Sequence, residues 1–460
     1  MRTDAMPEDL RTIRACFEGG VPCTLASADA QGEPNVVFVS QAEWVDERHI
    51  ALSFQFFNKT RRNILVNPHV QLILVHPTTG EQFRIAARYL RTEFEGPLFE
   101  RMRAKLAGIA SHTGMGGVFK LLGADLYEVL DLERVRTTAI VPRTPAPERM
   151  PALRRACEHL SVRADLEDLF DRCMQALERH FGLRHAMLLL PDAPRRRLYT
   201  MASLGYARSG VGSEIALGDG VIGVAAQSGT PIRINHLTQD ASYCRAARVQ
   251  GPEGQSSTPE REIAYPGLAE PHSQMALPIA WGAGLPAVLF VESEQAMCFD
   301  WDLEDALSVF CLQLGAHLRA LQPVVEAPDE AAPPPATPAA AAAPGSTGHA
   351  PPLRVRFFEV DSSVFLDDEY VIKGVAGAVL WTLVSEYQAT GRTEFTNREL
   401  RLRPALRLPD LNDNLEARLV LLRRRLAERR SDLQIEKIGR GRLRLQLQRG
   451  LELTPVPRTG

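Results

Sequence analysis

The N-terminal part of the chain is a series of short apolar runs, each bounded by turn residues. Runs with this spacing are typical of β-strands. A helix is predicted over residues 60–66, and it ends at Asn67-Pro68 because proline cannot continue a helix. Residues 8–141 are therefore predicted to form a β-barrel with helical inserts. The predicted strands are residues 23–27, 36–39, 49–54, 70–75 and 123–130.

A second block, residues 152–322, mixes helical and strand patterns. Apolar side chains between Leu166 and Phe181 recur at steps of three and four residues, which indicates an amphipathic helix. Later apolar runs predict buried strands, so this block is typical of an α/β sandwich. Its last helix has apolar residues at near-heptad spacing, which either pack into their own domain or form a dimer seam. The strand runs are residues 186–190, 275–279 and 287–292, and the near-heptad positions are 303, 307, 310, 314, 318 and 321.

The last block, residues 353–450, ends in a helix followed by a hairpin. Four leucines share one face of the helix within residues 411–430, and most of its arginines lie off that face. We expect the leucines to dock the helix and the cationic side to stay available to a partner. The leucines are Leu415, Leu419, Leu422 and Leu426. Residues 433–438 and 443–447 alternate around a Gly-Arg-Gly turn as hairpin strands do, residues 355–360 and 363–366 predict a small sheet, and residues 375–387 predict a helix.

Residues 323–352 join the second and third blocks and are nearly all Ala, Pro, Gly, Ser and Thr from position 326 onward. Such a segment buries too little apolar surface to offset the entropy of ordering it, so we predict a disordered tether. A Pro-rich tether of this length would let the last block move almost independently of the others.

Composition indicates a multidomain α+β chain. It has 460 residues, 45% hydrophobic and 24% charged, with a net charge of -3, which is too long for one core and suits three. No apolar run is long enough to cross a bilayer and the N-terminus lacks an apolar targeting core, so we expect a cytoplasmic protein without a membrane partner. The seven cysteines are scattered without zinc-ligand spacing, so no metal site is predicted.

The helix of the first block stands in the string Phe56-Phe57-Asn58-Lys59-Thr60-Arg61-Arg62-Asn63-Ile64-Leu65-Val66-Asn67-Pro68. This string resembles the split barrel of pyridoxamine 5'-phosphate oxidase relatives, which implies bound flavin mononucleotide (FMN). A helix N-terminus with cationic and hydroxyl donors suits the FMN phosphate. The candidate cofactor ligands are Asn58, Lys59, Thr60, Arg61 and Arg62.

Two alternatives stay open for this first block, and a third is disfavoured. The basic residues could simply cover a surface helix beside an empty barrel. Some relatives hold haem or a deazaflavin, and His112 is then a conceivable axial ligand. An oxidase of vitamin B6 itself is disfavoured, because the Trp-Arg-Leu stretch of that enzyme has no counterpart between Val135 and Pro151.

The second block resembles a GAF domain, a small-ligand sensory module. The resemblance rests on Gly218-Asp219-Gly220-Val221-Ile222-Gly223-Val224-Ala225, on Gly229-Thr230-Pro231-Ile232-Arg233-Ile234, and on the strand ending Val291-Glu292-Ser293. It implies a small-molecule ligand of unknown identity. A sensory role and a ligand-free dimerising role remain equally open.

The last block resembles the winged-helix effector domain of OmpR-type response regulators. Leu415-Glu416-Ala417-Arg418-Leu419 with Leu422-Arg423 and Arg425-Leu426 matches the recognition helix, and Glu436-Lys437-Ile438-Gly439-Arg440-Gly441-Arg442 matches the wing. The resemblance implies DNA binding, with Arg418 near the groove and Arg423 and Arg425 on phosphates or in ion pairs. Residues 353–460 hold about 20 Lys plus Arg against about 15 Asp plus Glu. The candidate DNA contacts are Arg418, Arg423, Arg424, Arg425, Arg440 and Arg442, although a packed helix with a solvated arginine face gives the same pattern.

Together these patterns predict a one-component sensory transcriptional regulator, in which a flavin-binding split barrel and a GAF domain, in a homodimer, control a tethered winged helix on DNA. Two alternatives remain: an FMN-dependent oxidoreductase with regulatory domains, and a cofactor-free interaction scaffold. Because the chain lacks a Ser-His-Asp order, a Walker loop and kinase or cyclase signatures, we favour the regulator over an enzyme.

Overall fold

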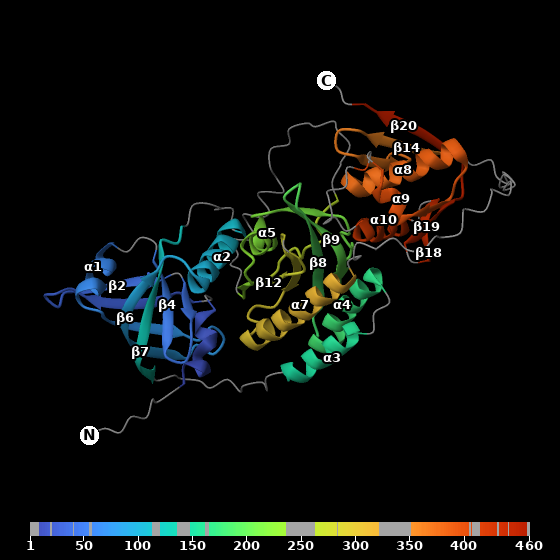
Figure 1. Cartoon of the computed structure of the whole chain (residues 1–460). Coiled ribbons are helices and arrows are strands. Elements are labelled where there is room, and N and C mark those ends of the chain that lie inside the picture. Colours follow the sequence, from blue (N-terminus) through green and yellow to red (C-terminus); the bar gives the residue numbers. More distant parts are fainter. Residues whose placement is uncertain are drawn as a thin grey trace.

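The structure is a computed structural model of the chain. It describes residues 9–18, 21–39, 41–54, 58–112, 120–135, 148–161, 165–235, 263–282, 284–321, 351–403, 406, 415–429, 432–439 and 441–457. We call residues 9–135 the barrel unit, 148–321 the central unit and 351–457 the C-terminal unit. The central unit lies between the other two (Figure 1). The predicted tether falls outside the described residues, apart from Pro351 and Pro352.

The barrel unit is one antiparallel sheet of the order β2-β1-β5-β6-β7-β4-β3. Its core is formed by alternate strand residues such as Leu25, Ile50, Leu72 and Ile85, each at most 2% exposed. All five strands expected from the sequence are present. The elements are the 3-10 helix η1 (Leu10–Phe17), β1 (Cys23–Ala28), β2 (Pro34–Val39), β3 (Ala42–Trp44), β4 (His49–Phe54), α1 (Asn58–Val66), β5 (His69–Val75), β6 (Gln82–Glu93), α2 (Pro97–His112) and β7 (Gly123–Val135).

The central unit is a sheet of the order β10-β9-β8-β13-β12-β11, covered by helices on both faces. Alternate residues of β8 face opposite sides, because Leu188 and Leu190 join the core under α3, α4 and α7, while Met187 and Leu189 join the core under α5. This is the predicted α/β sandwich. The elements are α3 (Arg149–Ser161), α4 (Leu166–Phe181), β8 (His185–Asp192), β9 (Arg197–Leu204), β10 (Glu214–Ala216), α5 (Gly220–Ser228), β11 (Ile232–Ile234), β12 (Ser273–Ile279), β13 (Ala287–Ser293) and α7 (Trp301–Leu321).

The near-heptad residues of α7 belong to the core of their own unit. Leu303, Leu307, Phe310, Leu314 and Leu318 are each at most 2% exposed and pack with residues of α3 and α4. Of the two interpretations of this pattern, core packing is therefore confirmed, since residues buried in this way cannot form a seam with a second chain.

The C-terminal unit joins two small sheets through helices. One sheet has the order β16-β15-β14-β20 and the other β17-β19-β18. The predicted sheet, first helix and hairpin are all present. Strand β20 pairs in parallel with β14 and extends the unit past residue 450, which the sequence did not predict. The elements are β14 (Leu353–Phe358), β15 (Ser363–Leu366), β16 (Glu369–Ile372), α8 (Gly374–Thr390), β17 (Glu394–Thr396), α9 (Asn397–Arg401), α10 (Leu415–Glu428), β18 (Leu433–Gly439), β19 (Arg442–Leu447) and β20 (Leu451–Val456).

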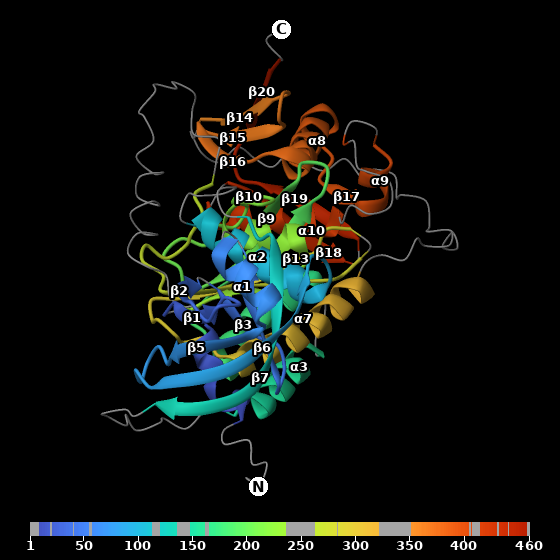
Figure 2. The same ribbon diagram turned by 90° about the vertical axis from the view of Figure 1, so that its left-hand side faces the viewer.

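The barrel unit is fastened to the central unit by helix packing and a buried ion cluster. Helix α2 packs against α5 and β11, where the absence of a side chain at Gly108 brings the helix close to Ile232. Arg233 of β11 forms ion pairs with Glu18 and with Glu304, its Nε lying 2.5 Å from Glu304 Oε2. Burial raises the pKa of the Glu18 carboxyl, although the Arg233 and Lys105 cations oppose this shift. Figure 2 views the molecule from the barrel side.

In the described part of the chain, no helix combines the length and apolarity that spanning a membrane requires.

Candidate functional sites

A small cavity opens in the barrel unit beside the N-terminal half of α1. Its volume is about 240 Å³ including the open mouth. Its lining comes from four strands and one helix: Leu25, Val39, Leu52, Ser53, Phe54, Thr60, Arg61, Asp125 and Tyr127.

Arg61 is the central polar group of this cavity. Its Nη1 donates to Asp125 Oδ1 at 2.6 Å and to Thr92 Oγ1 at 2.5 Å. The guanidinium also lies 4.9 Å from the centre of the Phe54 ring and 5.5 Å from that of Tyr89. Strands β4, β6 and β7 thus fix one guanidinium at the cavity wall, where it can bind an anion.

Two further groups in the cavity have shifted pKa values. Burial raises the pKa of Asp125, although the Thr92 hydroxyl and the Arg61 guanidinium oppose the shift. Burial also raises the pKa of Tyr127 well above its ordinary value. The Ser53 hydroxyl is buried and finds no hydrogen-bond partner among the described residues. The cavity therefore offers one cation, one unsatisfied hydroxyl and one carboxyl that holds its proton more tightly than usual.

The cofactor ligands predicted from the sequence are only partly brought together. Arg61 and Thr60 line the cavity, and Thr60 is buried with its Oγ1 accepting a 2.8 Å hydrogen bond from Asn35 Nδ2. Lys59 and Arg62 are exposed on α1 and do not line it.

Two of the sequence candidates have side chains outside the described residues. Asn58 begins α1, and the alternative haem ligand His112 ends α2. The sequence missed Ser53, Asp125 and Tyr127, because their chemistry appears only when β4 and β7 pair beside α1.

Helix α10 carries the second candidate site, and its leucine face is docked as predicted. Leu415, Leu419, Leu422 and Leu426 are at most 6% exposed. The expectation that the cationic side stays available to a partner is wrong in this arrangement. Instead, most of the α10 arginines are buried or paired with the central unit.

Arg418 and Arg425 are the most deeply buried of these arginines, each 6% exposed. Arg418 Nη2 lies 3.1 Å from Asp192 Oδ2, and its guanidinium stacks 4.2 Å from the centre of the Tyr199 ring. Arg425 donates through Nε to the Val371 carbonyl at 3.2 Å. Arg418, expected near a DNA groove, therefore faces the central unit.

Arg423 and Arg424 pair with the first turns of α4. Arg423 Nη1 lies 2.8 Å from Glu167 Oε2, and Arg424 Nη2 lies 2.6 Å from Asp171 Oδ1. Arg424 also donates to the carbonyls of Glu167 and Met201. The predicted freedom of the C-terminal unit is thus wrong for this state.

The hairpin cations behave differently. Arg442 and Arg444 are half exposed, with side-chain exposures of 59% and 46%, and both pair with Glu394. Arg440, the remaining predicted DNA contact, lies outside the described residues. These two hairpin arginines therefore remain exposed to solvent, unlike Arg418 and Arg425 of α10.

Models of two protein families match parts of the chain. Residues 10–124 match the model described as pyridoxamine 5'-phosphate oxidase, and residues 163–319 match that of the GAF domain. The chain therefore contains a domain similar to pyridoxamine 5'-phosphate oxidase, followed by a GAF domain. A search of the curated proteins finds no match.

Among solved structures, the chain is similar to an FMN-binding protein from Syntrophomonas wolfei subsp. wolfei (16% identity, TM-score 0.25, covering 28% of this chain and 88% of that one). It is also similar to the GAF domain of an Acinetobacter phosphoenolpyruvate-protein phosphotransferase (20% identity, TM-score 0.29, covering 38% and 96%). A third similar structure is a free methionine-R-sulfoxide reductase from Neisseria meningitidis bound to its substrate (16% identity, TM-score 0.28, covering 40% and 96%).

Proposed function

We propose that this protein is a one-component transcriptional regulator, in which a flavin-binding barrel and a GAF domain control a winged-helix DNA-binding unit. The observation that carries the proposal is the order of elements after residue 351. A small sheet is followed by α8, β17, α9, α10 and the hairpin β18–β19, with β17 closing the hairpin into a three-stranded sheet. In winged-helix proteins, such an order places the last helix in the major groove and the hairpin beside it.

The barrel cavity supports the sensory half of the proposal. Arg61, Thr60 and Ser53 would hold the FMN phosphate, and the unsatisfied Ser53 hydroxyl and the Arg61 guanidinium fit an anion with several acceptor oxygens. When bound, the flavin supplies a redox-responsive group. Absorbance bands in the flavin region that survive desalting of the purified protein, and that are lost in Arg61→Ala, would support this assignment; a colourless wild-type protein would reject it.

The remaining parts of the proposal concern the GAF ligand and the oligomer. The face of the GAF sheet under α5 holds a buried carboxylate, Glu292, which accepts hydrogen bonds from Tyr206 (2.8 Å) and Gln274 (3.0 Å). The small-molecule ligand of this domain is part of the proposal because residues 163–319 match the GAF domain. A homodimer remains part of the proposal, supported by Val36 and Phe38 on the edge strand β2, which are 63% and 74% exposed.

DNA binding is tested most directly through the exposed hairpin cations. The full chain should bind a mixed-sequence duplex, and Arg442→Ala with Arg444→Ala should weaken binding and lower the salt slope by about 2. The matched control is Arg84→Ala with Arg88→Ala, which removes two arginines of the barrel unit with exposures of 49% and 48%. Equal loss in both variants, or no binding at low salt, would reject the proposed output.

A flavin-dependent oxidoreductase is the second candidate, because Asp125 places a carboxyl of raised pKa at the cavity wall beside Arg61. Such a group can give a proton to a bound substrate. Consumption of NADH or NADPH with turnover of an added small molecule would favour the enzyme. Loss of turnover in Asp125→Asn, with flavin absorbance retained, would assign the role to this residue.

A further inference from the structure

Helix α4 presents a row of acidic groups to the basic side of α10. Asp165 precedes the helix, and Glu167 and Asp171 follow within its first two turns. Each of the three pairs with a cation of the C-terminal unit: Lys437 at 2.8 Å, Arg423 at 2.8 Å and Arg424 at 2.6 Å. A fourth carboxylate, Asp192 at the end of β8, pairs with Arg418. Negative charges of the central unit thus face four cations of α10 and the hairpin.

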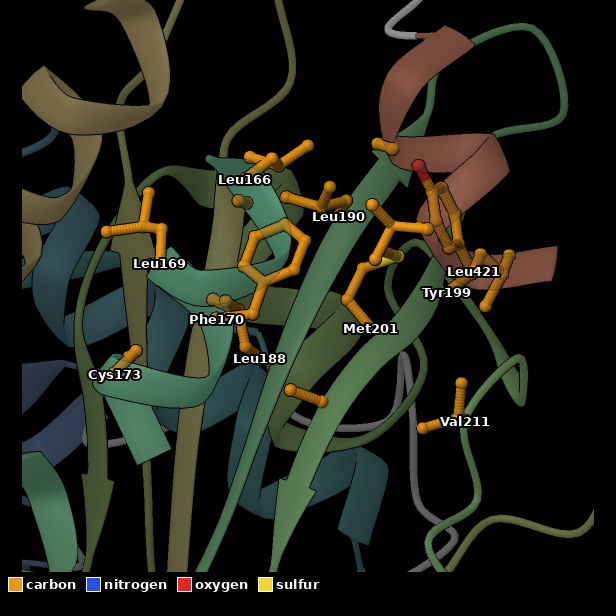
Figure 3. Close-up of a cluster of buried hydrophobic side chains, with 14 of the residues drawn as sticks. Leu166, Leu169, Phe170, Cys173, Leu188, Leu190, Tyr199, Met201, Val211 and Leu421 are labelled. Carbon is orange, nitrogen blue, oxygen red and sulfur yellow. The ribbon is translucent and has the colours of Figure 1, made fainter. Parts of the chain in front are cut away.

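A small apolar contact, which we call the apolar seat, lies beside these ion pairs. Leu421 of α10 is 3% exposed and sits beside Tyr199, in a cluster that includes Met201 and Phe170 of the central unit (Figure 3). At the rim, the Arg195 side chain lies close to the backbone of Gly374, whose φ is +72°, so a side chain added at Gly374 would collide with the Arg195 guanidinium. The interface therefore combines matched charge with a small apolar centre.

We infer that the central unit competes with duplex DNA for the basic side of α10, with the carboxylates of Asp165, Glu167, Asp171 and Asp192 standing where DNA phosphates would otherwise lie. This inference rests on the proposed function, because it takes α10 as the DNA-reading helix. A duplex and the central unit cannot occupy Arg418, Arg423 and Arg424 together, since each arginine already donates to the central unit. The docked chain is then the form with low DNA affinity.

The connection between the two units makes such competition effective. A partner on the same chain is present at an effective concentration in the millimolar range when the connecting segment spans the sites. Free duplex at lower concentration meets a site that is already occupied. Salt weakens the ion pairs and the phosphate contacts alike, so the apolar seat around Leu421 biases the competition toward docking.

The central sheet connects this interface to the barrel unit. Strand β11, at one edge of the sheet, packs against α2 and carries Arg233. Strands β9 and β10, at the other edge, supply Tyr199, whose ring lies under Arg418, and Glu214, which pairs with Lys373 at 3.2 Å. The barrel unit and the C-terminal unit therefore contact opposite edges of one sheet.

The test neutralises the competitor in the full chain. Glu167→Gln with Asp171→Asn removes two carboxylates from the interface, and Glu158→Gln with Glu178→Gln removes two exposed carboxylates of the same unit. Both variants change the net charge equally. Small-angle scattering reports undocking as a larger radius of gyration, and fluorescence anisotropy with a labelled mixed-sequence duplex of roughly 30 base pairs reports affinity. We expect the interface variant to expand and to bind about tenfold more tightly than wild type, while the control does neither.

Other outcomes separate the inference from the proposed function. Expansion without a gain in affinity, or an equal gain in the control, overturns the inference and leaves DNA binding in place. An expanded protein that binds no duplex even at low salt rejects DNA binding itself. If Glu167→Gln with Asp171→Asn stays docked, the charge-reversal variant Glu167→Lys with Asp171→Lys places like charges against Arg423 and Arg424. Its control is Glu158→Lys with Glu178→Lys. A charge-reversal variant that also stays docked overturns the inference.

Discussion

Arg424 of α10 pairs with Asp171 of α4 across 253 positions of sequence, with 2.6 Å between Nη2 and Oδ1. The same guanidinium donates to two main-chain carbonyls of the central unit, so it is held by geometry as well as charge. Arg424, which the sequence predicts as a DNA contact, therefore also holds the C-terminal unit against the central unit.

The apolar seat should contribute to docking independently of charge. Leu421→Ala removes a buried side chain beside Tyr199, at a cost of about 2 kcal/mol in the free energy of docking. Hydrogen exchange should then accelerate at the facing amides of α4 and α10 while the core of the central unit stays protected. Leu312→Ala, at a leucine of α7 that is 65% exposed, is the control and should leave exchange unchanged. Unchanged exchange in Leu421→Ala would show that the seat contributes nothing.

The Arg61–Asp125 pair should be strongly coupled. Their side chains are 21% and 9% exposed, so Arg61→Ala leaves a buried carboxylate without its cation and should lower the free energy of unfolding by about 3–5 kcal/mol. Asp125→Asn in the same chain should recover much of that loss. Denaturant unfolding of the two single variants and the double variant measures the coupling. Additive losses would mean that the pair contributes no interaction energy.

Arg233 should hold the barrel unit to the central unit. Its side chain is 4% exposed between Glu18 and Glu304, so Arg233→Met leaves two carboxylates facing each other in the interface. We expect limited proteolysis to separate the barrel unit from the remainder much faster than in wild type. Arg319→Met, at an exposed arginine of α7, should leave the cleavage rate unchanged. Equal cleavage of Arg233→Met and wild type would contradict the assigned role.

Docking should be insensitive to pH near neutrality. Burial alone would raise the pKa of Asp165, but the Asp168 backbone N–H and the Lys437 ammonium outweigh it and lower that pKa. Likewise, burial would lower the pKa of Lys437, but the hydrogen bonds and charges of Asp165 and Glu416 raise it. The contribution of Asp165 to the free energy of docking is therefore complete above its ordinary pKa of 3.8, and it is lost as the pH falls through the lowered pKa. The contribution of Lys437 is complete below its ordinary pKa of 10.5, and it is lost as the pH rises through the raised pKa.

Scattering at a series of pH values checks this expectation. The radius of gyration should stay constant between about pH 5 and pH 9. The double variant Asp165→Asn with Lys437→Gln lacks both titrating groups. Any pH-dependent increase in the radius of gyration that arises from this pair at acid or alkaline pH should therefore be absent from it. Expansion of wild type close to neutrality would contradict the prediction.

Sequence periodicity predicted several elements in each of the three units, but not all of them. The leucine stripe of α10, the hairpin β18–β19 and the helix α8 all follow from spacing, because each depends on residues only a few positions apart. Strand β20 was missed, since its partner β14 lies about 100 residues earlier and a parallel pairing leaves no turn signal in the sequence. The short, polar strand β17 was missed because its own residues carry no apolar alternation, and only its antiparallel pairing with β19 defines it.

In the candidate sites, too, sequence spacing indicated some of the residues, and tertiary contacts revealed the others. Sequence indicated Arg61 as a cofactor ligand from its place on a basic helix, but the cavity was completed by Ser53, Asp125 and Tyr127 from paired strands. It likewise put the arginines of α10 together on one side of a helix. Only tertiary packing decided what that side meets, because helical period fixes which side chains share a face, whereas the surface that covers the face comes from residues more than 200 positions away. The amino-acid order thus determined the modules and their charges, and the docked arrangement decided that the acidic end of α4 covers the arginines of α10.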